Sequence, residues 1–311
     1  MSMRCWSIIL LALLLGGCSN PVEWLGVRLL YEEAAASERV WLDLPYREDE
    51  GADPVKHRLD LFLPDGQGWP VLIFVHGGGW TAGDKALRAG GADVYRNIGR
   101  FYASQGIGTA VINYRLQPKV TWREQVDDVA QAIAWVRERA TQEGGDADAL
   151  FVMGHSAGAQ LAAFVALDER PLSAAGSSTS ALCGVIPVSG AGYDLADDET
   201  YDELGAERSW YEERFRAGDP GDDWLREASA ISYVRADAPP FLLVHVTNEW
   251  ESLQHQNRLL HAALETAGAD SRLIVIPGQG HNRMVLNLSR GDRTPVPEVL
   301  EMIQQSDCGS G

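Results

Sequence analysis

Residues 150–166 read Leu-Phe-Val-Met-Gly-His-Ser-Ala-Gly-Ala-Gln-Leu-Ala-Ala-Phe-Val-Ala. The apolar run at residues 150–153 is typical of a buried strand, and the Ala- and Leu-rich run that follows is typical of a helix. Between them, Gly154 and Gly158 flank Ser156 in a Gly-x-Ser-x-Gly pentapeptide. A sharp strand-to-helix turn needs these glycines because the serine is strained and the chain segments crowd each other. The stretch therefore predicts a nucleophilic serine at a helix N-terminus, where backbone N–H groups favour a developing negative charge.

The rest of the chain repeats this alternation of short apolar strands with amphipathic helices. Two extended runs, at 39–45 and 57–63, are predicted to pair antiparallel at a sheet edge. The further predicted strands are 71–75, 107–113, 150–153, 183–188, 241–246 and 272–276, and the predicted helices are 122–139, 157–166, 253–267 and 297–304. This spacing indicates βαβ units, and so an α/β fold with a mostly parallel sheet.

One segment, approximately 194–237, interrupts the alternation. It is rich in Asp, Glu, Trp and Tyr and has no obvious strand. We expect an insertion that folds as a lid over the C-terminal edge of the sheet, within a single catalytic domain spanning 37–311. Its aromatic residues Trp210, Tyr211 and Trp224 either line the substrate pocket or form a small core of the insertion itself.

The charge of the chain excludes one class of partner. Its 311 residues include 26 Lys+Arg and 44 Asp+Glu, which gives a formal net charge of −18. Such a chain repels nucleic acid phosphates, and no basic cluster offsets the repulsion, so nucleic acid binding is a poor interpretation. The acidity is explained by solubility.

The N-terminus has the features of an export signal: a positive charge at Arg4, an apolar run at 8–15, then Gly16, Gly17 and Cys18. The apolar run is too short to span a bilayer, which takes about 20 residues. Residues 15–18 (Leu-Gly-Gly-Cys) resemble a bacterial lipobox, which implies a signal peptide at 1–17, diacylation of Cys18 and a lipidated tether at 18–36 with a short helical stretch. Ser19 is compatible with sorting to the outer membrane, facing the periplasm. The alternative is a plain signal peptide or an uncleaved anchor.

Two cysteines remain in the predicted mature domain, Cys183 and Cys308. Export would make a disulfide between them possible. Cys183 begins an apolar run, however, so we expect a small buried residue in preference to a bridge.

A second motif, His76-Gly77-Gly78-Gly79-Trp80, directly follows the predicted strand 71–75. A glycine run here lets backbone N–H groups approach a substrate oxygen without side chains in the way. A phosphate-binding loop would need a Lys-Ser/Thr ending, which is missing. We predict an oxyanion hole formed by the amides of Gly78, Gly79 and Ala157.

A nucleophilic serine needs a base and an acid, in the chain order Ser, acid, His. His281 lies in a loop after the last predicted parallel strand, which makes it the candidate base. Glu249 follows the strand 241–246, so its carboxylate would face the same sheet edge and is the candidate acid. Glu251 is the alternative acid.

Together these motifs resemble the α/β-hydrolase family, in particular the His-Gly-Gly-Gly branch of lipases and esterases. Within that branch the chain is similar to carboxylesterases of the kynurenine-formamidase-like (BD-FAE-like) group. The resemblance spans about residues 59–284. Besides the elbow and the oxyanion glycines, it is carried by 59–64 (Leu-Asp-Leu-Phe-Leu-Pro), 83–85 (Gly-Asp-Lys), 113–116 (Asn-Tyr-Arg-Leu), 188–190 (Val-Ser-Gly), 193–195 (Tyr-Asp-Leu) and 238–245 (Ala-Pro-Pro-Phe-Leu-Leu-Val-His). Many members read Gly-Asp-x-Asp where this chain has Val-Thr-Asn-Glu at 246–249, so Glu249 occupies the place of the acid.

The resemblance implies an α/β-hydrolase fold and hydrolysis of short-chain acyl or aryl esters by a Ser156–His281–Glu249 triad, with no metal and no organic cofactor. The alternatives are a formamidase-like hydrolase of N-formyl aromatic amides and, more remotely, an inactive binding protein of the cell envelope. The expected partners are a small ester and, through Cys18, a membrane. The sequence does not predict an oligomeric state.

Overall fold

The computed structural model describes residues 31–35, 39–216, 221, 223–306 and 308. The predicted signal peptide, Cys18 and most of the predicted tether lie outside the described residues. Within these described ranges, no helix is both long enough and apolar enough to cross a membrane.

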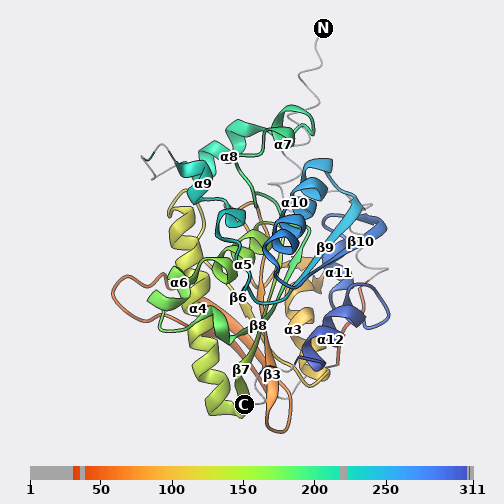
Figure 1. Ribbon diagram of the computed structural model, residues 1–311. Helices are drawn as coiled ribbons and strands as arrows, with labels where there is room; N and C mark the ends of the chain where they lie inside the picture. Colours follow the sequence, from red (N-terminus) through yellow and green to blue (C-terminus); the bar gives the residue numbers. More distant parts are fainter. Residues whose placement is uncertain (1–30, 36–38, 217–220, 222, 307, 309–311) are drawn as a thin grey trace.

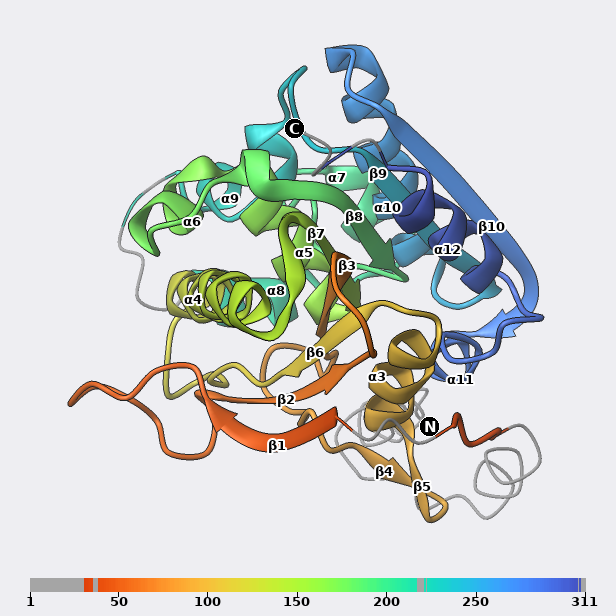
Figure 2. The same cartoon turned by 90° about the horizontal axis from the view of Figure 1, so that it is seen from below.

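An eight-stranded sheet forms the centre of the molecule, in the order β1-β2-β6-β3-β7-β8-β9-β10 (Figure 2). Its first two pairings, β1 with β2 and β2 with β6, are antiparallel, and the pairings from β6 to β10 are parallel. This confirms the predicted α/β fold with an antiparallel pair at one edge. The strands are β1 (Arg39–Pro45), β2 (Arg58–Leu63), β3 (Trp69–Val75), β6 (Gly108–Ile112), β7 (Gly145–His155), β8 (Leu182–Val188), β9 (Phe241–Asn248) and β10 (Ser271–Gly280).

Helices cover both faces of this sheet (Figures 1 and 2). The side chains of β3 alternate between two cores: Val71, Ile73 and Val75 join one core, and Leu72 and Phe74 join the other. A strand that is buried on both faces reads as a continuous apolar run, which explains the sequence of this strand. The first core is covered by α4 (Trp122–Glu143), α5 (Ala157–Leu167) and α10 (Glu251–Ala267), and the second by α3 (Val94–Ser104), α11 (Met284–Asn287) and α12 (Val296–Gln304).

The structure adds elements that the sequence analysis did not predict. The main one is α3, which contains Gly99 at the point where the helix packs on the ring of Phe62. A Cβ at this glycine would lie 2.2 Å from the ring. Close packing explains the glycine, which weakens the helical pattern in the sequence. The other additions outside the insertion are short: β4 (Arg88–Ala89), β5 (Ala92–Asp93), α6 (Glu169–Ala174), the 3-10 turn Thr179–Ala181 and α11 (Met284–Asn287).

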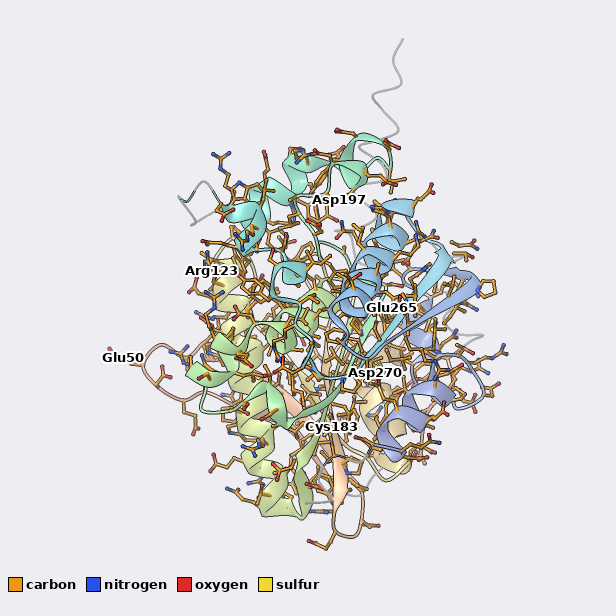
Figure 3. All side chains as sticks on the ribbon, viewed as in Figure 1. Glu50, Arg123, Cys183, Asp197, Glu265 and Asp270 are labelled. Carbon is orange, nitrogen blue, oxygen red and sulfur yellow. The ribbon has the colours of Figure 1, made fainter. Side chains whose placement is uncertain are left out.

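The predicted insertion is helical and, among its described residues, has no strand. It carries α7 (Asp198–Asp202), α8 (Arg208–Phe215), α9 (Trp224–Glu227) and the 3-10 turn Ala230–Tyr233. Figure 3 labels Asp197, just before α7, at one end of the molecule, and Cys183, near the start of β8, toward the opposite end. The insertion therefore lies at the end where the parallel strands finish (Figure 1).

Outside the insertion, two other segments bear on the sequence predictions. Residues 31–35 are not helical and contact α3: the amide of Ala34 donates to Asn97 Oδ1 at 2.8 Å, and Asn97 Nδ2 donates to the carbonyl of Glu32 at 2.7 Å. Cys183 and Cys308 are both free thiols, and Cys183 is buried, as expected for a small core residue.

Candidate active site

Ser156 occupies the turn between β7, which ends at His155, and α5, which begins at Ala157. Its φ of 56° is in the left-handed region, which is strained for a residue with a side chain. The flanking glycines permit this turn. A Cβ at Gly154 would lie 2.1 Å from the carbonyl oxygen of Gly158, and a Cβ at Gly158 would lie 2.3 Å from that of Val75. The backbone therefore requires glycine at both positions.

The candidate base and acid lie beside this serine, although 125 and 93 positions separate them from it in the sequence. His281 Nε2 is 3.0 Å from Ser156 Oγ, and His281 Nδ1 is 2.8 Å from Glu249 Oε2. The Glu249 side chain is fully buried, and its Oε1 accepts a hydrogen bond from the amide of Val246 at 3.2 Å. Glu251, the alternative acid, is exposed at the first turn of α10. The structure thus joins Ser156, His281 and Glu249 in one row of hydrogen bonds.

His155 packs against His281, a contact that the sequence analysis did not predict. Its ring lies 4.9 Å from the ring of His281, between centroids, and its Nε2 is 3.1 Å from the carbonyl oxygen of His281. Burial lowers the pKa of His155 to about 3, so the ring is neutral and Nε2–H donates this hydrogen bond. A contact between a side chain and a distant carbonyl leaves no pattern in the sequence.

The glycine loop after β3 approaches the nucleophile closely. A Cβ at Gly77 would lie 3.1 Å from the Cβ of Ser156. Gly78 and Gly79 have φ values of 130° and 58°, and a Cβ at Gly78 would lie 2.0 Å from the carbonyl oxygen of Ala82. Within the described part of the chain, the amides of Gly78, Gly79 and Ala157 have no recorded hydrogen-bond acceptor. Three backbone donors are therefore available, one directly after the serine and two on the loop that approaches it.

Aromatic side chains flank the row on two sides. Trp210 of the insertion faces the oxyanion glycines: a Cβ at Gly79 would lie 3.4 Å from its ring. Tyr211 and Trp224 are buried in the core that also contains Trp80 and one face of the sheet, so they do not form a separate small core of the insertion. On the other side, the ring of Trp250 is 5.5 Å from that of His281 and is 41% exposed.

Metal-ligating residues do not cluster at this site: among the described residues, no group of three or more His, Cys, Asp or Glu side chains is arranged to hold a metal ion. The polar groups around Ser156 are the imidazole, the carboxylate and the amides described above.

Residues 59–264 match the model of the BD-FAE family. The chain belongs to this family. Among curated relatives, it is 36% identical over 237 residues to esterase LipQ of Mycobacterium tuberculosis, an alignment that covers 73% of this chain and 53% of that protein. It is also 27% identical over 270 residues to the isoprenylcysteine alpha-carbonyl methylesterase ICME of Arabidopsis thaliana, covering 82% and 61%. The chain thus spans between half and two thirds of the length of these relatives.

Solved structures show the same fold at low sequence identity. The inhibited esterase B of Lactobacillus rhamnosis has a TM-score of 0.71 at 24% identity, over 90% of this chain and 89% of that one. The esterase of Pyrobaculum calidifontis has a TM-score of 0.69 at 22% identity, over 91% and 90%. These similarities confirm the α/β-hydrolase fold predicted from the sequence.

Proposed function

We propose that this chain is a carboxylesterase that hydrolyses its substrate through an acyl-enzyme intermediate on Ser156. The observation that carries the proposal is the hydrogen-bonded row of Glu249, His281 and Ser156 beside a glycine loop with available amides. Membership of the BD-FAE family and relatives named as esterases support it.

In the proposed reaction, Ser156 Oγ attacks the ester carbonyl while His281 Nε2 takes its proton. Glu249 holds His281 with the proton on Nδ1, so that Nε2 is free to accept, and it stabilises the imidazolium that forms. The tetrahedral intermediate collapses when His281 returns the proton to the leaving alcohol. A water molecule, deprotonated by His281, then attacks the acyl-serine. His281 returns that proton to Ser156 Oγ as the acyl–oxygen bond breaks and the acid is released.

The amides of Gly78, Gly79 and Ala157 would bind the oxygen that becomes negative in each tetrahedral intermediate. They suit this role because they are fixed by the backbone before the reaction begins. In other enzymes, removal of one such donor costs about 2.7–4 kcal/mol of transition-state stabilisation.

We propose short-chain acyl or aryl esters as the substrate class. The ring of Trp210 lies beside Gly79, which favours small acyl groups, and the ring of Trp250 lies 5.5 Å from that of His281, which would protonate the leaving alcohol. An N-formyl aromatic amide would meet the same groups, so a formamidase-like activity is the second candidate. An inactive binding protein would have no use for an aligned nucleophile and base.

The test uses the purified protein on p-nitrophenyl esters from acetate to longer acyl chains, with Ser156→Ala as the control. We expect turnover by the parent, strongest with the short chains, and loss of nearly all activity in the variant with an unchanged fold. Equal rates in both proteins would refute the assignment of the nucleophile. Faster cleavage of an N-formyl aromatic amide than of the matched ester would reverse the order of the two candidates.

We further propose that the enzyme is anchored in the cell envelope by lipid on Cys18, on the strength of the lipobox-like sequence alone. Membrane fractionation of cells expressing the parent and Cys18→Ala tests this. The parent should sediment with membranes and the variant should not; the same distribution for both would refute the anchor.

A further inference from the structure

Arg214, on α8 of the insertion, contacts the glycine loop directly. Its Nε donates to the carbonyl oxygen of Gly79 at 3.3 Å, and its Nη1 donates to the carbonyl oxygen of Trp210 at 2.8 Å. The guanidinium also stacks on the Trp210 ring, 3.7 Å from its centroid. One side chain of the insertion therefore holds both an oxyanion glycine and the indole that closes against it.

The charge of Arg214 is not explained by an ordinary ion pair. Its side chain is only 9% exposed, and the carboxylate recorded near it, Glu213, lies 3.6 Å away and is 82% exposed. Burial accordingly lowers the pKa of the guanidinium from its usual range. Removing a charge from water is costly unless its surroundings compensate, and here main-chain carbonyls and a ring do so. An uncharged side chain could pack at this position with a smaller desolvation cost. The presence of a buried arginine therefore indicates that its positive charge has a function.

The backbone that Arg214 holds is itself strained. The strained residue is Trp80, which has a side chain and a φ of 64°, whereas Gly79 before it adopts its φ of 58° without steric cost. Such conformations persist only where the surroundings fix them. The carbonyl of Trp80 accepts from Gln125 Nε2 at 2.7 Å, and Trp80 Nε1 donates to Gln160 Oε1 at 3.2 Å. The amide of Gln117 also donates to the carbonyl of Trp80, at 3.1 Å. Arg214 adds a restraint on the peptide between Gly79 and Trp80.

We propose that Arg214 is a positioning residue of the oxyanion hole, which acts through the carbonyl of Gly79. Its hydrogen bond fixes the orientation of the peptide that follows Gly79, in the loop that approaches Ser156, and its positive charge favours the negative oxygen of the tetrahedral intermediate. The inference rests on the proposed function, because it assigns a role within the same reaction.

The test compares Arg214→Gln and Arg214→Lys with a matched control, Arg208→Gln. Arg208 lies on the same helix and also stacks on a ring, at 4.1 Å from the centroid of Tyr201, but it pairs with Asp198 and has no recorded contact with the glycine loop. Three quantities are measured for each protein: kcat and KM on a p-nitrophenyl ester, the rate at which a fluorophosphonate labels Ser156, and the inhibition constant of phenylboronic acid. Phenylboronic acid forms a tetrahedral, negatively charged adduct with the serine, and labelling by the fluorophosphonate passes through a transition state with negative charge on the phosphoryl oxygen.

For Arg214→Gln we expect kcat and the labelling rate to fall by roughly 10-fold or more, since a hydrogen bond from a charged group is lost. Boronate binding should weaken by a similar factor, while KM stays within about 3-fold. Arg214→Lys, which keeps the charge without the planar fork, should lie between the parent and Arg214→Gln. Arg208→Gln should behave as the parent.

A structural role alone would lower the melting temperature without selectively weakening boronate binding, and a role in substrate entry would raise KM; either result overturns the proposal. If Arg214→Gln does not fold, Arg214→Lys decides, and unchanged kcat and boronate binding in that variant refute it. A parent that reacts with neither the ester nor the fluorophosphonate refutes the proposed function instead. A reactive parent matched by Arg214→Gln refutes only the role of Arg214.

Discussion

Glu249→Gln gives a sharp test of the triad, because the two carboxylate oxygens have different partners. Oε2 faces His281 Nδ1 at 2.8 Å, and Oε1 accepts from the amide of Val246 at 3.2 Å. A glutamine side chain has only one acceptor oxygen. If that oxygen keeps the hydrogen bond from Val246, the NH₂ group turns to His281 and requires Nδ1 to accept. The proton then moves to Nε2, which can no longer take the proton of Ser156.

The expected effect is large because the site offers no easy substitute. The Glu249 side chain is fully buried, so water does not replace the lost acceptor. The corresponding amide substitution in a serine protease triad lowers kcat about 10⁴-fold by stabilising the wrong tautomer. We expect a loss of the same order here, equivalent to about 5.4 kcal/mol of transition-state stabilisation.

The assay measures initial rates on p-nitrophenyl acetate for the parent, Glu249→Gln and Glu251→Gln, with melting temperatures as a check of folding. Glu251 is the matched control: it lies two residues away, on the first turn of α10, and is exposed. Surface substitutions of this kind change energies by about 0.5 kcal/mol, so its rate should stay within about 2-fold of the parent. A folded Glu249→Gln protein with more than about a tenth of parental activity would refute the reasoning, and so would an equal loss in both variants.

Two further predictions concern stability. Lys85 is buried, with its Nζ 2.6 Å from the buried carboxylate of Asp60, which also pairs with Arg96. Because Lys85→Met removes one partner of a buried charge, it should lower the free energy of unfolding, measured in urea, by about 3 kcal/mol, and a loss below about 1 kcal/mol would contradict this. Burial holds the pKa of His76 at about 4 and that of His155 at about 3, below the value of 6.5 for an exposed histidine. Below pH 6.5 the unfolded chain therefore binds more protons than the folded chain. The free energy of unfolding should fall as the pH is lowered from about 6.5 toward 4, by up to about 2.7 kcal/mol per pH unit for the two histidines together. His155→Gln should halve that slope, and equal stability at pH 7 and pH 5 would contradict the prediction.

The proximity of Ser156, Glu249 and His281 could be predicted because each follows a parallel strand. Such strands end at one edge of the sheet, so the sequence order of Ser156, Glu249 and His281 translates directly into proximity. The close packing of the glycine motif could be predicted in the same way. Only a residue without a side chain fits where neighbouring atoms come as close as they do around Ser156. These predictions depend on backbone geometry, which local sequence determines well.

Contacts between distant side chains and main-chain carbonyls could not be predicted. His155 reaches the carbonyl of His281 across 126 positions, and Arg214 reaches that of Gly79 across 135. Any residue offers a carbonyl, so neither contact leaves a pairing of residue types to detect. The helix α3 could not be predicted for a related reason. Its Gly99 weakens the helical pattern, and this glycine is required only because the ring of Phe62, on another element, packs against the helix there.

The contact between Arg214 and Gly79 gives the insertion a larger role than that of a lid. A lid that only covers the site would change which substrates enter, and hence KM, without altering the chemical step. Here α8 holds the carbonyl of Gly79 through Arg214 and packs Phe215 on Trp80, 4.9 Å between ring centroids. Because we propose that the amides of the same loop bind the oxyanion, a shift of α8 would, on that proposal, move groups that act in the transition state. Substitutions in the insertion should therefore alter kcat as well as substrate range. Every substitution that displaces Arg214 should change both quantities together.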